Sequence, residues 1–128
     1  MTLFTAVFCY SESEGESLVA GLADHAESPE HYVLFERVKC PSEEDKALNH
    51  DQPYVEIDDQ RFSGYGALQR VVLEGRDLTL YFKAGSSFSA HGADSCQIVL
   101  GEDIVLQDFF GTLRLICGDI FVASEPLS

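Results

Sequence analysis

The sequence predicts an α+β fold: a single domain over residues 1–128, built on a twisted antiparallel sheet of six or seven strands, with a C-terminal helix packed on one face. Three observations support this prediction. Residues 67–82 contain two alternating segments around a tight turn, as in a β-hairpin. Several other short segments are apolar or alternate between apolar and polar residues. Residues 106–117 instead carry apolar residues at helical spacing.

The register of the predicted hairpin follows from its apolar residues. We place Gly75 and Arg76 at the turn, because glycine readily adopts the positive φ of a two-residue loop. The facing pairs are then Leu73 with Leu78, Val71 with Leu80, and Gln69 with Phe82. One face of the hairpin collects Ala67, Val71, Leu73, Leu78, Leu80 and Phe82. A slip of one residue would scatter these side chains over both faces, so this pairing is favoured.

Four further strands are expected before this hairpin. They cover residues 3–9, 17–24, 31–38 and 54–58. The segment 17–24 is also compatible with a helix, but a strand on each side of the proline-containing turn at 27–30 would make a hairpin. Residues 11–16 and 58–60 are predicted turns. Residues 63–66 (SGYG) are expected to break the sheet as a bulge or a kinked corner, with Tyr65 packed across it.

Two helices are expected. Residues 41–48 predict a short one, with Ser42 as N-cap and Asp45 completing a capping box. The longer helix covers 104–117, with Asp103 as its cap and Gly118 just after its end. Its apolar stripe consists of Leu106, Phe109, Phe110, Leu113, Ile116 and Cys117. Two strands around a turn at 110–111 are the alternative.

The remaining segments are shorter. Residues 84–92 predict a loop or a short frayed helix, and 96–100 predict a strand. Residues 120–123 are expected to dock on the rest of the fold.

Negative charge is the most unusual feature of the composition. The chain has 22 acidic and 8 basic residues, a formal net charge of −14, and residues 1–59 hold fourteen of the acids but three of the bases. Phosphate contacts need Lys and Arg, so nucleic acid is not expected as a partner. The acidic half indicates either a basic protein partner or a solvated surface that raises solubility.

The sequence also bears on location. No apolar run approaches the ~20 residues of a membrane span, and no basic, apolar leader typical of secretion is visible. We therefore expect a cytoplasmic protein with no membrane partner. The four cysteines, which include no closely spaced pair, are expected to be reduced and mostly buried, with no metal site among them.

Residues that can support catalysis are present but scattered. The sequence has no nucleophile elbow, phosphate-binding loop or zinc-protease motif. His25 and His31 flank a turn that contains Glu27 and Glu30, which is compatible with a loose metal site but more typical of a solvated loop. We expect no catalytic residue, no metal site and no cofactor.

Four segments in the middle of the chain resemble a known family. They are 45–48 (DKAL), 54–57 (YVEI), 63–66 (SGYG) and 73–80 (LEGRDLTL). Together with the expected strand around Tyr32, they are similar to the immunity protein 10 family of bacterial polymorphic toxin systems. The likeness extends over residues 18–117 and is strongest in the middle, whereas 91–95 and 104–117 depart from the family's pattern.

The resemblance implies a small cytoplasmic protein that binds and silences a toxin domain made by the same cell, with no catalytic residues to transfer. Combined with the charge, it predicts an acidic surface that meets a basic toxin surface, for example the substrate cleft of a nuclease. The acidic contact candidates are Glu12, Glu14, Glu16, Glu27, Glu30, Glu43, Glu44, Asp45, Glu56, Asp58 and Asp59. Tyr54 and Tyr65 are the candidate aromatic anchors.

Two other functions stay open on the sequence. An enzyme would assemble its site from residues such as His50, Asp58 and Tyr65, converging in a deep pocket. An adaptor or dimerisation module would instead present a large self-complementary apolar patch. The sequence is compatible with a monomer and with a homodimer.

Overall fold

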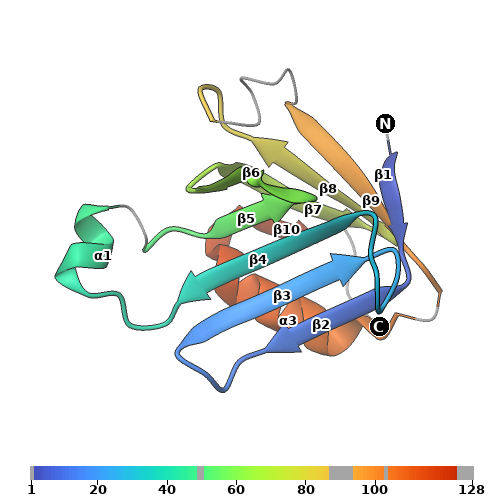
Figure 1. Cartoon of the computed structure of the whole chain (residues 1–128), viewed down its shortest axis with the longest axis horizontal. Helices are drawn as coiled ribbons and strands as arrows, with labels where there is room; N and C mark the ends of the chain where they lie inside the picture. The colour runs from blue at the N-terminus through green and yellow to red at the C-terminus, as the bar shows by residue number, and fades with distance from the viewer. Residues whose placement is uncertain (1, 49–50, 87–93, 103, 124–128) are drawn as a thin grey trace.

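The computed structural model of the chain describes residues 2–48, 51–86, 94–102 and 104–123. In this part of the chain, ten strands form two five-stranded sheets (Figure 1). The elements in chain order are β1 (Thr2–Ala6), β2 (Phe8–Glu12), β3 (Ser17–Ala23), β4 (Tyr32–Val38), α1 (Glu43–Ala47), β5 (Tyr54–Ile57), β6 (Asp59–Tyr65), β7 (Leu68–Glu74), β8 (Asp77–Phe82), β9 (Ser95–Leu100), α3 (Leu106–Cys117), the 3₁₀ turn η1 (Gly118–Ile120) and β10 (Phe121–Ala123).

The sheet nearest the viewer in Figure 1, here called the front sheet, has the strand order β2-β3-β4-β5-β6. Each strand pairs antiparallel with the next one along the chain. Side chains alternate between the two faces of a strand, and one face is buried. Its core residues are Leu18, Ala20, Leu22, Val33, Phe35, Val55 and Ile57. The opposite face carries the intervening residues.

The other sheet, here called the back sheet, has the order β1-β9-β8-β7-β10. Its centre is an antiparallel meander of β7, β8 and β9. The two edge strands join it in parallel: β1 pairs with β9, and β10 pairs with β7. Buried side chains from both sheets and from α3 form one hydrophobic cluster, so the sheets share a core.

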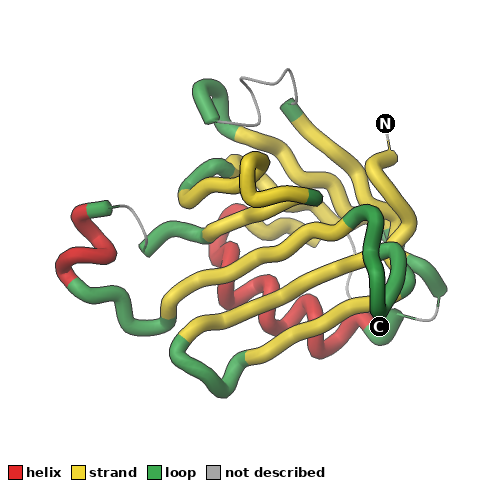
Figure 2. The backbone as a smooth tube through the Cα atoms, viewed as in Figure 1, coloured by secondary structure: helices red, strands yellow, loops and turns green. Residues whose placement is uncertain are grey.

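Helix α3 packs against the inner face of β2, β3 and β4 and lies behind the front sheet in Figure 2. Its buried stripe comprises Phe109, Phe110, Leu113, Ile116 and Cys117, as the helical spacing predicts. The alternative of two strands is therefore wrong. Arg37 Nη1 donates a hydrogen bond to the carbonyl oxygen of Ile116 at 2.9 Å, which ties the last turn of the helix to β4.

The predicted fold class, α+β with a C-terminal helix on a sheet face, is confirmed. The strand arrangement is richer than expected, since two sheets replace one and their edges include parallel pairs. Segment 17–24 is a strand, and α1 has the predicted capping box between Ser42 and Asp45. Gly118 follows α3 with φ 61°. Residues 120–123 dock as predicted: Ile120 ends η1 and packs against the core, and 121–123 form strand β10.

Local details of the sheets differ from the expectations. The apolar stretch 3–9 divides at Val7 into β1 and β2, which belong to different sheets. The pairs Leu73–Leu78 and Val71–Leu80 are confirmed, but Phe82 pairs with Leu68 rather than Gln69, because the register shifts between Leu68 and Arg70. Strand β6 continues through the predicted break at 63–66 as far as Tyr65.

Some of the predicted features fall wholly or partly outside the described residues. The expected cap of α3, Asp103, lies outside the described residues, and the residue at the N-cap position is Val105, which makes no side-chain cap bond. Most of the loop expected at 84–92 also lies outside them. The four cysteines are free: Cys117 is buried, Cys9 and Cys96 are half-buried, and Cys40 is exposed.

Candidate functional site

Three rows of side chains cross the outer face of the front sheet. The strand register aligns Phe8–Ala23–Tyr32, Tyr10–Gly21–Leu34–Glu56–Ser63, and Glu12–Val19–Glu36–Tyr54–Tyr65. This face is turned toward the viewer in Figure 1, with α3 behind the sheet, and no described helix or strand lies over it. We call it the tyrosine–carboxylate face, defined by Tyr10, Glu12, Tyr32, Leu34, Glu36, Tyr54, Glu56 and Tyr65.

Glu56 lies at the centre of the tyrosine–carboxylate face and is 9% exposed. The hydroxyl of Tyr54 donates to its Oε1 at 2.6 Å, and the hydroxyl of Tyr32 donates to its Oε2. Burying a carboxylate is costly unless hydrogen bonds replace its hydration. The two tyrosines supply those bonds, so the negative charge is held in a fixed position on an otherwise uncovered sheet.

The phenols of Tyr54 and Tyr65, beside Glu56, stay protonated near neutral pH because their pKa values are raised. Partial burial, and then the hydrogen bond to Glu56, raise the pKa of Tyr54. Partial burial, and then the negative charges of Glu36 and Asp45, raise the pKa of Tyr65. The rings of Tyr54 and Tyr65 pack against each other with their centroids 5.0 Å apart. Two aromatic rings therefore lie next to the carboxylate-bearing Glu36 in this row.

The edge of the face toward β2 is more exposed. Tyr10 is 48% exposed, and its hydroxyl donates to Glu12 Oε2 at 2.8 Å. That hydrogen bond raises the pKa of Tyr10, so this phenol also stays protonated at neutral pH. None of the described side chains brings a positive charge within ion-pair distance of Glu12, Glu36 or Glu56. The face thus presents carboxylates that described cations do not neutralise.

The structure brings part of the predicted contact set together on this face: Glu12, Tyr54, Glu56 and Tyr65. The other candidates lie around it. Glu14 and Glu16 are exposed in the β2–β3 turn, and Glu27 and Glu30 are exposed in the β3–β4 turn at the opposite end of the sheet. Helix α1 carries Glu43, Glu44 and Asp45. Asp59 begins β6, and its side chain is outside the described part of the structure.

Sequence reasoning missed four members of the face, namely Tyr10, Tyr32, Leu34 and Glu36. The alternation in 31–38 gave a usable signal, because Tyr32, Leu34 and Glu36 must share the face opposite Val33 and Phe35. What the alternation does not reveal is the register that places Leu34 beside Glu56. Tyr10 was missed because the strand was expected to end at residue 9.

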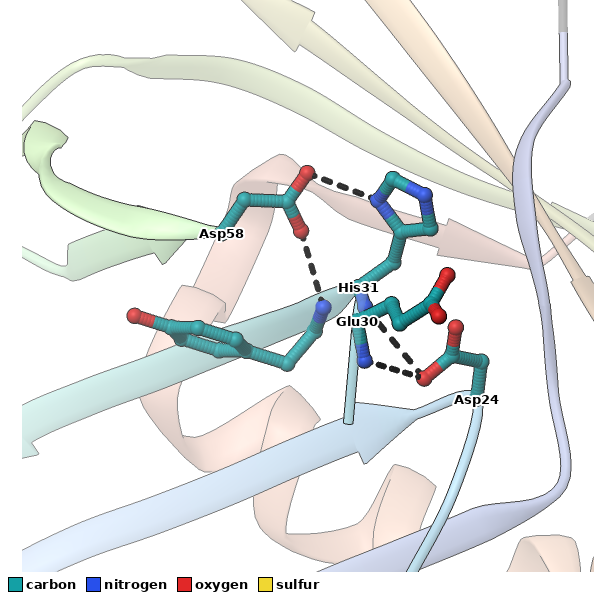
Figure 3. A network of polar contacts seen from close by, with 5 residues as sticks. Asp24, Glu30, His31 and Asp58 are labelled. Carbon is teal, nitrogen blue, oxygen red and sulfur yellow. Dashed lines mark hydrogen bonds and ion pairs between the residues drawn. The ribbon is translucent and has the colours of Figure 1, made fainter. Parts of the chain in front are cut away.

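Asp58, another predicted contact, is engaged within the chain. It occupies the β5–β6 turn with φ 62°. Its Oδ2 lies 2.9 Å from His31 Nδ1, and its Oδ1 accepts a hydrogen bond from the backbone N–H of Tyr32 at 2.9 Å (Figure 3). Asp24 Oδ1 accepts from the backbone N–H groups of Glu30 at 3.0 Å and His31 at 3.3 Å. Together these bonds connect the β3–β4 and β5–β6 turns.

This polar network shifts the pKa values of two of its members. The hydrogen bond with Asp58 raises the pKa of His31, and this effect outweighs the opposing effect of partial burial. Partial burial tends to raise the pKa of Asp24, but the N–H groups of His31 and Glu30 outweigh it and lower that pKa. The charged forms of His31 and Asp24 are therefore favoured by the fold of these two turns.

The same network contains the one described group of metal-ligating residues that lie close together. Ligand atoms of Asp24, Glu30 and His31 are all within 4.8 Å of one another. This set differs from the one that the sequence suggests, since it includes Asp24 and leaves out His25 and Glu27. Asp24 Oδ1 already accepts two backbone hydrogen bonds and His31 Nδ1 is engaged by Asp58, so we assign these residues a structural role.

Of the enzyme site considered from the sequence, the two described residues, Asp58 and Tyr65, lie apart. Asp58 lies at the closed end of the β5–β6 hairpin, whereas Tyr65 pairs with Tyr54 at its open end. Tyr65 lines a hollow of about 380 Å³ together with Lys83 and Ser86, and Asp58 does not line it. His50 lies outside the described residues.

The buried thiols are also unsuited to act as nucleophiles. Burial raises the pKa values of Cys96 and Cys117 to about 12. Both therefore stay protonated near neutral pH, and the thiolate is the reactive form.

Comparisons with known proteins point to one family. A family model described as Immunity protein 10 matches residues 4–105, which include the end of β1, all of β2 to β9 and both turns of the polar network. A search of curated proteins gave no match. Among the described helices, none is long and apolar enough to cross a lipid bilayer. The match covers most of the sequence and agrees with the resemblance of its central segments, and the chain belongs to the immunity protein 10 family.

Proposed function

We propose that this protein neutralises a cognate bacterial toxin domain by binding it through the tyrosine–carboxylate face, in the cytoplasm and without catalysis. Membership of the immunity protein 10 family implies a toxin partner. The observation that carries the proposal is the uncovered sheet face, on which four tyrosines and three glutamates come together.

The composition of this face suits a protein partner. Tyrosines such as Tyr10, Tyr54 and Tyr65 offer large contact areas with few rotatable bonds, and tyrosine is enriched among residues that dominate binding energy. Glu56 is already oriented by two hydroxyl groups. A toxin lysine or arginine would meet a carboxylate that needs little reorganisation, and desolvation at the interface centre would strengthen their attraction.

The toxin surface that fits this face is basic, and the cleft of a nuclease is one example. The exposed acids outside the face, in the two turns and on α1, would surround the contact without taking part in it. Rim charges of this kind mainly raise the association rate, whereas the buried anchors slow dissociation. Glu14, Glu16, Glu27, Glu30, Glu43 and Glu44 are assigned this steering role.

Co-expression with the toxin tests the proposal. The toxin is taken as the variable C-terminal domain of a large secreted protein encoded directly upstream. Wild-type protein should protect the producing cell and co-purify with the toxin domain. Glu36→Lys, which reverses a charge on the face, should weaken binding at least tenfold, about 1.4 kcal/mol.

The matched control is Glu74→Lys. It makes the same charge change at an exposed position on the back sheet, opposite Asp77, and should leave binding close to the wild-type value. Equal effects of the two substitutions would contradict the assignment of the face. Failure of the wild-type protein to bind or protect against this toxin would contradict the function. The mass of the purified complex, measured by light scattering, also shows whether the protein acts as a monomer or a homodimer.

A further inference from the structure

The front sheet ends in a free edge at β2. Strand β2 pairs with β3 on one side, and no described strand pairs with its other side. The backbone N–H and C=O groups along such an edge can pair with an added strand, so natural proteins usually cover or obstruct it. In Figure 1, β2 forms the lower border of the front sheet with α3 directly behind it.

A groove runs between this edge and α3. Its volume is about 550 Å³, and its walls come from two elements: Ser11, Glu12, Ser13 and Glu14 on the β2 side, and Gln107, Asp108, Gly111, Thr112 and Leu115 on the α3 side. The groove is open at Gly111, since a Cβ built at this position would meet no atom within 4 Å. Leu115 is 61% exposed and adds apolar surface at the helix wall.

The lining of the groove has one sign of charge. The charged residues of the lining are Glu12, Glu14 and Asp108, and no lysine, arginine or histidine is among the lining residues. A concave site lined by one sign of charge attracts the opposite sign more strongly than a flat surface does. A second copy of this chain is a poor occupant, since it also carries a net charge of −14.

We propose that an extended, lysine- or arginine-bearing segment of the toxin adds to the free edge of β2 and places its basic side chains in the groove between β2 and α3. This inference rests on the proposed function and specifies part of the partner. Addition of a strand to a sheet edge supplies backbone hydrogen bonds, while pockets for alternate side chains supply specificity. Alternate residues of the added segment would point toward α3 and Asp108, and the others toward Tyr10 and Glu12 on the outer face.

A peptide of alternating lysine and valine, blocked at both ends, is a suitable first probe. Titrated into the isotopically labelled protein, it should shift the amide resonances of β2 and of the α3 residues that line the groove. A peptide with glutamate in place of lysine should cause no such shifts. Two further peptides carry N-methyl groups on alternate peptide bonds, one on the odd-numbered and one on the even-numbered bonds. If the backbone pairs with β2, one of the two peptides should not bind, because its methyl groups replace the N–H groups that face β2.

Gly111 offers a matched pair of variants. Gly111→Arg fills the groove and places a positive charge in it, and should raise the peptide's Kd at least tenfold. Gly111→Ala leaves the groove open and should bind the peptide as the wild type does. Both substitutions replace glycine by a better helix former at an exposed position, so loss of folding is not expected to confuse the comparison.

The outcomes separate this inference from the proposed function. Four results of the peptide experiments would overturn the strand-addition proposal. The first is that the peptide does not bind, and the second is that it shifts only resonances on other surfaces. The third is that it binds Gly111→Arg as tightly as the wild type, and the fourth is that it binds equally well with either set of alternate peptide bonds N-methylated. Self-association of the protein through β2 would overturn the proposal as well. If Gly111→Arg still protects cells from the toxin as well as the wild type does, the groove is not used although the immunity function stands. If the wild-type protein gives no protection, the proposed function itself fails.

Discussion

At the scale of single residues, Asp58 shows how a charged side chain can be withdrawn from the surface that its sequence position suggests. As one of several acids beside a predicted strand, it belonged to the expected contact set. In the structure both of its oxygens are engaged, one by His31 and one by the backbone of Tyr32. Its carboxylate therefore stabilises the neighbouring β3–β4 turn and is not free to contact a partner.

The substitution Asp58→Asn tests this role. Asparagine also tolerates the positive φ of this position and keeps an oxygen for the N–H of Tyr32, so the change mainly removes the negative charge. The pKa of His31, which the hydrogen bond with Asp58 raises, should fall toward its ordinary value of about 6.5. An NMR titration of the His31 ring measures this change.

The same variant should alter how stability depends on pH. Because the pKa of His31 is raised in the folded state, its contribution to stability is fully present below about pH 6.5 and is lost as the pH rises through the raised pKa. Asp58→Asn should therefore destabilise the protein more in mildly acidic than in mildly alkaline buffer. Glu27→Gln, which removes an exposed charge from the β3–β4 turn that precedes His31, serves as the control. An unchanged His31 pKa in Asp58→Asn would contradict the assignment.

At the scale of elements, the connection between β9 and α3 depends on a close backbone approach at Gly101. Its N–H donates to the carbonyl oxygen of Ala6 at 2.8 Å, which ties the end of β9 to the end of β1. A Cβ at position 101 would lie 2.8 Å from that same oxygen. Such a contact is too short to persist, so one of the two backbones would have to move.

Two glycine-to-alanine substitutions make this argument testable. Gly101→Ala should lower the free energy of unfolding by about 1–3 kcal/mol, the usual range for overpacking. Gly111→Ala, in the middle of α3 where an added Cβ meets no atom within 4 Å, should raise it by about 0.5–1 kcal/mol through helix propensity. Urea denaturation of both variants measures the difference. Equal effects of the two substitutions would show that the approach at Ala6 is not restrictive.

The elements that could be predicted are those whose signals are local. The β7–β8 hairpin has an apolar set that only one register keeps on one face, and α3 has a one-sided apolar stripe. The break at Val7 could not be predicted, because an apolar residue between two strands leaves no local mark. The register shift that pairs Phe82 with Leu68 likewise could not be read from the alternation of apolar residues, which predicted Gln69 as its partner.

At the scale of the whole molecule, the unpredicted features are all long-range. The first and last of the described strands, β1 and β10, join the back sheet in parallel. The residue pattern within each of these strands does not indicate which strand it pairs with. The tyrosine–carboxylate face depends on four successive strand registers. Tyr54 and Glu56 could be proposed from their own strand, but their position beside Tyr32 and Glu36 required the folded sheet.

The charge of the whole molecule leads to a prediction about the kinetics of toxin binding. The net charge is −14, and exposed acids stand in the turns at both ends of the front sheet. Such a field steers a basic partner over distances comparable with the Debye length, which shortens from about 30 Å at 0.01 M salt to about 8 Å at 0.15 M. The association rate should therefore fall several-fold or more over this range.

The dissociation rate should respond much less to salt, because the tyrosine contacts and the partly buried Glu56 act at short range. Stopped-flow and surface-binding measurements at several salt concentrations separate the two rates. The double substitution Glu27→Gln and Glu30→Gln should slow association alone, whereas Tyr10→Ala should speed dissociation alone. An association rate that does not depend on salt would remove the electrostatic part of the mechanism, and the face would then have to act through its aromatic contacts alone.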